Sequence, residues 1–307
     1  MAAATLAYSQ RQPIADPILQ ANDWKYHDQP RKAIAILEPL LQAHTLSPHD
    51  TGLAWIVLGT SWEHLEAYDQ ARRCFESAIQ SLAPLSDARA DYAAAIDNLG
   101  SVEGSIGDVE ASRRLREQAS RIYAELGDHT GLAISFNNLA LNAMTRHDYR
   151  HARQFLDRSF EESKHASVSD DDLAALFSVK GSLAFHDGHY EAALDAFRQS
   201  LDYRIRAHGP ACPVLGVVYA MRAQTYLQLR DIAHANADID RALDLIGGAV
   251  GKNSPSYLRV QLLRAQSLRL AGDTREAELV ERNSNTALTA WRQAACAGCS
   301  VTVQSLR

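Results

Sequence analysis

Residues 126–159 read LGDHTGLAISFNNLALNAMTRHDYRHARQFLDRS and contain two helical patterns in succession. In the first half of this stretch, apolar and small side chains recur three or four residues apart in two registers. This spacing predicts a helix that is buried on more than one side. The two registers are Ile134, Asn138, Leu141 and Thr145, and Leu132, Phe136, Leu139 and Ala143.

A break at His147 and Asp148 separates this helix from a second one. The carboxylate of Asp148 can accept a hydrogen bond from the free N–H groups at the start of the second helix. Because the link is so short, the two helices must run antiparallel, and the stretch is predicted to be a helical hairpin. The second helix carries one apolar and small face, formed by Ala152, Phe155, Leu156 and Ser159.

The spacing of small residues indicates that this hairpin is repeated. Ala140 is followed by Ala152 twelve residues later and by Ser159 nineteen residues later. Seven triplets share these offsets, and twenty of their twenty-one residues are Ala, Gly or Ser. Side chains of this size allow two helix axes to approach within about 8–10 Å. The other six triplets are Ala21/Ala33/Leu40, Gly59/Ala71/Ala78, Gly100/Ser112/Ala119, Gly181/Ala193/Ser200, Ala223/Ala235/Ala242 and Ala265/Ala277/Ser284.

We therefore expect an all-α fold, namely a right-handed α-α superhelical solenoid of about seven helical hairpins over residues 13–293. Successive hairpins are 38 to 42 residues apart. Ser47-Pro48 and Ser254-Pro255 each predict the start of a first helix, because a capping serine precedes a proline at the first helical position. No linker composition separates the hairpins, so a second domain is not predicted.

The pattern resembles the tetratricopeptide repeat, a helical hairpin of about 34 residues that stacks into solenoids. The period of this chain is longer, and with the stretch from Leu126 it resembles the kinesin-light-chain style of the repeat. The resemblance implies a protein that binds other proteins. The residues that carry it most clearly are Trp55, Leu58, Gly59, Trp62, Tyr68, Ala71, Phe75 and Ala78, and then Gly181, Gly188, Tyr190, Ala193 and Phe197.

Composition and charge exclude several classes of protein. The chain has 307 residues, 46% of them hydrophobic, and a formal net charge of −6, which argues against nucleic-acid binding. The densest basic cluster, Arg113, Arg114 and Arg116, has the spacing of a solvated helix face. Neither a membrane span nor a signal peptide is indicated, and four cysteines do not make a disulfide framework, so a cytoplasmic protein is predicted.

The two ends of the chain depart from the repeat. Residues 1–12 have no clear partner face and are expected to be a flexible segment. In the tail, residues 294–307, Val301 and Val303 alternate with Thr302, which is typical of a strand. We expect the tail to fold back as a cap on the last hairpin, with addition to a partner's sheet edge as the alternative.

No pattern of residues predicts catalysis, a metal site or a cofactor. Cys296 and Cys299 form half of a zinc site at most, since no second pair stands at ligand spacing. The twelve histidines lack the arrangement of a metallohydrolase, and no nucleotide-binding or nucleophile motif occurs. The sequence therefore predicts a protein that is not an enzyme.

Asparagine residues are the best candidates for a binding site. Asn98 and Asn138 each stand two residues before the small residue of a first helix. In proteins that this sequence resembles, asparagine at this place grips the backbone of an extended peptide, because a carboxamide offers both a donor and an acceptor. The alternative is that both only bond neighbouring helices. The other candidate binding residues are Ser101, Asn137, Leu141, Met144 and His186, with Asp97 and Ser105 beside them.

A second register places basic residues directly before the small residue in three successive repeats. These residues are Lys180, Arg222 and Arg264, 42 residues apart. They could bind a partner's carboxylates, or pair internally with acids such as Asp238 and Asp240. The internal pair is the favoured interpretation.

These observations predict a non-catalytic interaction protein whose concave groove binds a peptide or helix of a partner. Two alternatives remain open at this point: a regulatory sensor that closes around a small peptide signal, and a scaffold that assembles with itself through the 294–307 tail. The sequence does not indicate the oligomeric state.

Overall fold

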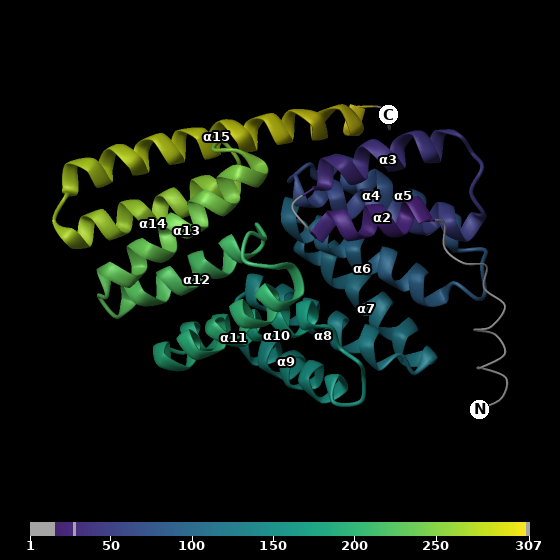
Figure 1. The fold of residues 1–307 in the computed structure, drawn as a ribbon, viewed down its shortest axis with the longest axis horizontal. Helices are drawn as coiled ribbons and strands as arrows, with labels where there is room; N and C mark the ends of the chain where they lie inside the picture. Colours follow the sequence, from purple (N-terminus) through teal and green to yellow (C-terminus); the bar gives the residue numbers. More distant parts are fainter. Residues whose placement is uncertain (1–15, 27–28, 305–307) are drawn as a thin grey trace. The chain divides into compact units, whose positions relative to one another are not determined.

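The computed structural model describes residues 16–26 and 29–304, and every regular element in that part of the chain is an α-helix (Figure 1). The helices fall into two units, which meet between Val179 and Lys180. The first unit contains α2 (Asp16–Tyr26), α3 (Pro30–Gln42), α4 (Pro48–His64), α5 (Tyr68–Leu82), α6 (Arg89–Ile106), α7 (Val109–Leu126), α8 (His129–Thr145) and α9 (Tyr149–Ser163). Helix α10 (Asp170–His186) runs across the boundary. The second unit continues with α11 (Tyr190–His208), α12 (Leu215–Gln228), α13 (Ile232–Val250), α14 (Pro255–Ala271) and α15 (Thr274–Gln304).

Consecutive helices pack as antiparallel hairpins inside each unit. In the first unit these hairpins are α2/α3, α4/α5, α6/α7 and α8/α9, and in the second unit they include α12/α13 and α14/α15. First helices also contact the first helices of the next hairpin, as α4 and α6, α6 and α8, and α12 and α14 do. The predicted all-α fold of stacked helical hairpins is confirmed.

Helix starts follow the predicted capping chemistry. The side chain of Asp148 accepts a hydrogen bond from the backbone N–H of His151 at 3.3 Å, which caps the start of α9. Ser47 caps α4 and Ser254 caps α14 in the same way, each one residue before a proline. The link at His147 turns the chain with a positive φ of 59°.

The small residues of the repeat lie at the contacts between helices. All twenty Ala, Gly and Ser residues of the seven triplets are buried, and most of their side chains have no exposed surface. Leu40, the one larger member, is only partly buried and packs against the core of the first hairpins. Large apolar side chains from the second helices fill the space beside these contacts, as Phe75 and Phe197 do. The close helix approach that the spacing predicted is confirmed.

The tail is helical where the structure describes it. Helix α15 continues without a break from Thr274 to Gln304, so the interpretation of the 294–307 tail as strand-like is wrong. Three alanines between Gln293 and Gly298 favour helix strongly enough to carry it through the short Val-Thr-Val alternation. Residues 305–307 and the predicted flexible segment 1–12 lie outside the described residues.

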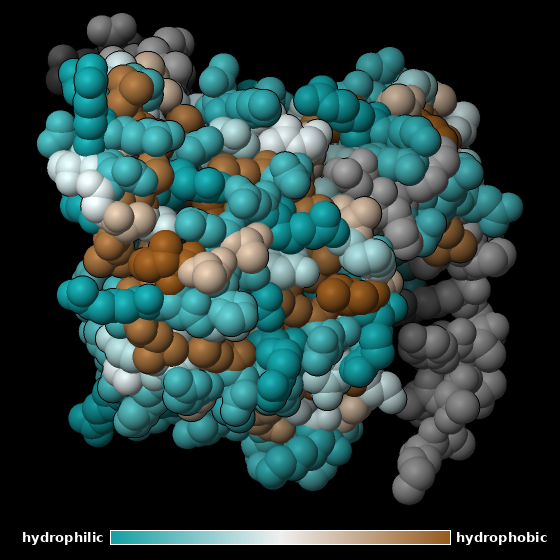
Figure 2. Space-filling model, turned by 60° about the vertical axis from the view of Figure 1, so that its left-hand side comes forward, coloured by the Kyte–Doolittle hydropathy of each residue, from teal (hydrophilic) through white to brown (hydrophobic). Residues whose placement is uncertain are grey.

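Hydrophobic residues are not confined to the core. Figure 2 shows one face on which hydrophobic residues, in brown, reach the surface between hydrophilic ones, in teal. The larger exposed apolar side chains of the first unit are Leu19, Ile106, Leu126 and Leu141. Among the described residues, no helix is long and apolar enough to cross a membrane.

A substitution at Gly59 tests the close approach of α4 and α5 directly. A Cβ atom on Gly59 would lie 2.7 Å from Cε1 of Phe75, a ring that is fully buried and cannot move aside. We expect Gly59→Ala to lower the free energy of unfolding by about 1–3 kcal/mol, measured by urea denaturation.

Gly248→Ala is the matched control, because a Cβ atom there would meet nothing within 4 Å. This variant should gain up to about 1 kcal/mol from the better helix propensity of alanine. Equal effects of the two substitutions would contradict the packing described here.

Candidate functional site

A cluster of polar side chains joins the first helices of three consecutive hairpins. The hydroxyl of Ser101 on α6 donates to Oε1 of Glu63 on α4 at 2.7 Å. One step further along the stack, Nδ2 of Asn138 on α8 donates to Oδ2 of Asp97 on α6 at 2.6 Å. These two bonds fix the register of α4, α6 and α8 relative to one another.

Arg116 enters this cluster from the second helix of its hairpin. Its side chain passes over Gly100, where an added Cβ atom would lie only 3.1 Å from Cγ of Arg116. The Nη1 group then donates to the backbone oxygen of Asn138 at 2.6 Å. Arg116 is only 6% exposed, so the interpretation of it as part of a solvated basic face is wrong. A glycine at the small-residue position makes room for a long cation inside the hairpin.

Burial controls the electrostatics of the cluster. It raises the pKa of Asp97, and the charge of Arg116 and the hydrogen bond from Asn138 offset this only in part. The pKa of Glu63 is raised for the same reason, against the hydrogen bond from Ser101 and the charge of Arg116. Burial also lowers the pKa of Arg116, against the attraction of both acids. The carboxyl groups of Asp97 and Glu63 thus both interact electrostatically with the one buried guanidinium of Arg116.

The cluster retains polar atoms that have no partner. Oδ1 of Asp97, Nε of Arg116 and Oδ1 of Asn137 are buried and make no hydrogen bond within the described part of the chain. Asp97 is 4% exposed and Asn137 is 3% exposed. Buried polar groups are normally hydrogen-bonded, so these atoms mark a place where the packing is incomplete.

The structure separates the predicted binding residues by their roles. Asn138 bonds the neighbouring helix, as the alternative interpretation of the asparagines expected. Asn98 is half-buried, and its carboxamide makes no hydrogen bond to any described residue. Leu141, one helical turn beyond Asn138, is 38% exposed, and Met144 is half-buried.

The last predicted residue, His186, is exposed in the final turn of α10. It belongs to the second unit, whereas the other six belong to the first. The structure therefore brings together the candidates on α6 and α8, but it does not add His186 to them.

Sequence reasoning missed Arg116 and Glu63 as members of this site. Both were hidden because a charged residue at helical spacing normally faces solvent. One signal was present: Gly100 stands where four of the other six repeats carry alanine, and a glycine leaves space for a neighbour. The later basic row behaves as predicted, since Arg222 makes two hydrogen bonds to Asp238 at 2.7 and 2.8 Å and Arg264 bonds Asp240.

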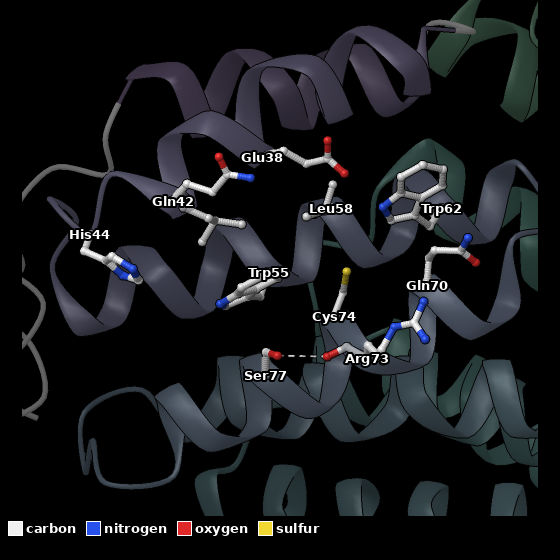
Figure 3. Close-up of a pocket in the computed structure, with 11 residues that line it drawn as sticks. Glu38, Gln42, His44, Trp55, Leu58, Trp62, Gln70, Arg73, Cys74 and Ser77 are labelled. Carbon is white, nitrogen blue, oxygen red and sulfur yellow. Dashed lines mark hydrogen bonds between the residues drawn. The ribbon is translucent and has the colours of Figure 1, made fainter. Parts of the chain in front are cut away.

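A pocket of about 580 Å³ lies between α3 and α5, with α4 as its floor. Figure 3 shows Trp55, Leu58 and Trp62 on α4 beside Cys74 of α5. Burial raises the pKa of the Cys74 thiol to about 12, so this group stays protonated and weakly nucleophilic at neutral pH. The pocket combines the apolar surface of these side chains with the polar groups of Glu38, His44 and Arg73.

The part of the chain that the structure describes contains no group of three side chains placed to hold a metal ion. The side chains of Cys296 and Cys299 lie outside the described residues.

Comparison with known proteins identifies the repeat. Residues 91–161, which contain most of the polar cluster, match the family described as tetratricopeptide repeat. This segment of the chain contains tetratricopeptide repeats. Among curated proteins no match is found.

Solved structures of low sequence identity share the fold of this chain. NprR in complex with its cognate peptide NprX superimposes with a TM-score of 0.61 at 12% identity, covering 84% of this chain and 72% of NprR. A Rap protein complexed with Competence and Sporulation Factor gives 0.59 at 14% identity, covering 90% and 81%. BtubC (BKLC) from P. vanneervenii gives 0.50 at 16% identity, covering 76% and 91%.

The raised pKa of Asp97 predicts a pH-dependent stability difference. In the unfolded chain this carboxyl group ionises near its usual pKa of about 3.9. In the folded chain it holds its proton to higher pH, so the group costs stability as the pH rises above about 4. We expect Asp97→Asn to gain stability relative to the natural protein between pH 4 and pH 7, measured by urea denaturation at several pH values.

Asp157→Asn, at an exposed position of α9, controls for the change in net charge. A stability difference for Asp97→Asn that shrinks as the pH rises would show that Arg116 outweighs the cost of burying Asp97.

Proposed function

We propose that this chain is a tetratricopeptide-repeat protein throughout and a protein-interaction module that binds an extended peptide or a helix of a partner along α6 and α8. The observation that carries the proposal is the contrast between the two asparagines. Asn138 is held by Asp97, whereas the carboxamide of Asn98 makes no hydrogen bond within the described residues. A carboxamide with a donor and an acceptor to spare matches the N–H and C=O groups of a peptide backbone.

The side chains around Asn98 suit such a partner. Ser101 stands one helical turn after Asn98 on α6, and Leu141 stands one turn after Asn138 on α8. Because Asn138 and Asp97 are bonded, these two turns lie side by side. Leu141 and Met144 supply apolar surface next to the polar groups, and methionine adapts easily to the shape of a bound side chain. Together they would form a binding surface with polar groups for the backbone of the partner and apolar groups for its side chains.

The hydrogen bonds of Asp97, Arg116 and Asn138 support this role because they hold α6 and α8 in fixed positions relative to one another. A binding surface that is ordered before its partner arrives loses less conformational entropy on binding. The fold shared with NprR, whose solved structure contains a cognate peptide, is consistent with the proposal. The proposal involves no cofactor and no catalytic step.

The test uses a random peptide library displayed on phage and selected against the full chain. We expect the selected peptides to lose at least about tenfold in affinity for the double variant Asn98→Ala with Leu141→Ser, measured by fluorescence anisotropy. This pair leaves the Asn138–Asp97 bond in place, so the circular dichroism spectrum should not change.

The same two changes at other exposed positions, Asn253→Ala with Leu279→Ser, provide a matched control. The proposal fails if every selected peptide binds the Asn98/Leu141 variant as tightly as it binds the control variant.

A further inference from the structure

A second pocket lies on another side of the first unit. It has a volume of about 590 Å³ and is lined by α7, α8 and α9. Leu132, Phe136 and Leu139 of α8 and Phe155 of α9 supply its apolar lining. The rings of Phe136 and Phe155 are stacked, with centroids 6.4 Å apart. Any group that enters this pocket meets a rigid aromatic and aliphatic floor.

Arg121 lines the pocket from α7, and the acids one turn away from it on that helix are engaged elsewhere. Glu117, one turn before it, bonds Arg113 at 2.7 Å through its side chain. Glu125, one turn after it, bonds Arg89 at 2.6 Å. Among the described residues, Arg121 makes a single hydrogen bond, from Nε to the backbone oxygen of Glu117 at 3.1 Å. Arg121 is exposed and has no carboxylate partner among the described residues.

Arg158 lines the same pocket from α9 and is in the same situation. Glu161 bonds Lys164 at 2.5 Å, and Glu162 bonds Nδ1 of His129 at 2.7 Å. The guanidinium of Arg158 stacks on Phe136, with its central carbon 3.9 Å from the ring centroid. It too lacks a carboxylate partner within the described ranges. Two guanidinium groups thus border one pocket, and neither is bonded to a carboxylate of the described residues, although Glu117 and Glu162 also line the pocket.

The extent of the pocket indicates the size of its ligand. A smaller pocket of about 270 Å³ shares Glu117, Leu139 and Phe155 with it and extends toward His151 near the start of α9. The two pockets therefore follow the groove between α7 and α9 for more than one helical turn. A groove of this length accommodates several side chains of a polypeptide. A single small anion would not fill it.

We propose that the groove between α7 and α9 is a second interaction surface, for an acidic amphipathic segment of a partner protein. Apolar side chains of the segment pack on Phe136, Leu139 and Phe155, and its carboxylates pair with Arg121 and Arg158. Arginine favours this use because its planar guanidinium binds a carboxylate through two hydrogen bonds. A nucleic acid fits less well, since a formal net charge of −6 on the chain disfavours a continuous polyanion.

The experiment selects peptides from a random library displayed on phage, with the Asn98→Ala/Leu141→Ser variant as bait so that the α6 and α8 surface does not contribute. We expect selected peptides that combine Asp or Glu with aromatic or aliphatic residues. Their affinity should fall at least about tenfold for Arg121→Gln with Arg158→Gln and should fall with rising salt. The variant Arg121→Lys with Arg158→Lys should retain part of the binding, because it keeps the charge.

Arg114→Gln with Arg150→Gln is the matched control, since it removes the same charge from exposed positions of the same two helices outside the pocket. Selected peptides without acidic residues would overturn the proposal. So would acidic peptides that bind the Arg121/Arg158 glutamine variant as tightly as the control, or tight binding of a fluorescent single-stranded DNA that depends on the same two arginines.

Discussion

The close approach of paired helices through small side chains is the constraint on which the rest of this structure depends. Where Gly59 or Gly181 faces an aromatic ring of the second helix, not even a methyl group fits. At Gly100 the same space admits Arg116, which bonds the backbone oxygen of Asn138 and whose pKa the charges of Asp97 and Glu63 affect. One packing rule therefore produces both the apolar contacts of the repeat and its buried charged cluster.

Helix α8 connects the two surfaces proposed for binding. Asn138 and Leu141 belong to the side that joins α6, whereas Phe136 and Leu139 line the groove between α7 and α9. A helix that is buried on more than one side normally has little surface left for a partner. On the α6 side Leu141 is 38% exposed, whereas Phe136 and Leu139 are buried and reach the groove only as its floor. The buried bonds of Asp97 and Arg116 hold α8 in place between the two surfaces.

Most of the fold could be predicted from the sequence because small residues at fixed offsets have only one structural use. The caps at Asp148 and Ser47 were predictable for the same reason. The site was harder to predict, because the position of Arg116 depends on the space that Gly100 leaves in another helix. The spacing of residues along the sequence does not show where such space exists. The prediction for the tail is wrong because the helix propensity of the alanines before it outweighs a three-residue alternation. The lack of a carboxylate partner for Arg121 and Arg158 could not be predicted. Each ion pair near them depends on side-chain rotamers and on residues distant in the sequence, such as Arg89.

Amide hydrogen exchange of the full chain, with and without a peptide selected on the natural protein, tests the central claim most directly. If the hydrogen-bonded helices α6 and α8 form an ordered binding surface, the peptide should increase amide protection in α6 from Asn98 to Ser105 and in α8 from Asn138 to Thr145. The bonds between the two helices should make both segments slow to exchange even without peptide. Fast exchange of these segments in the free chain, or peptide protection confined to α2–α5, would contradict the account.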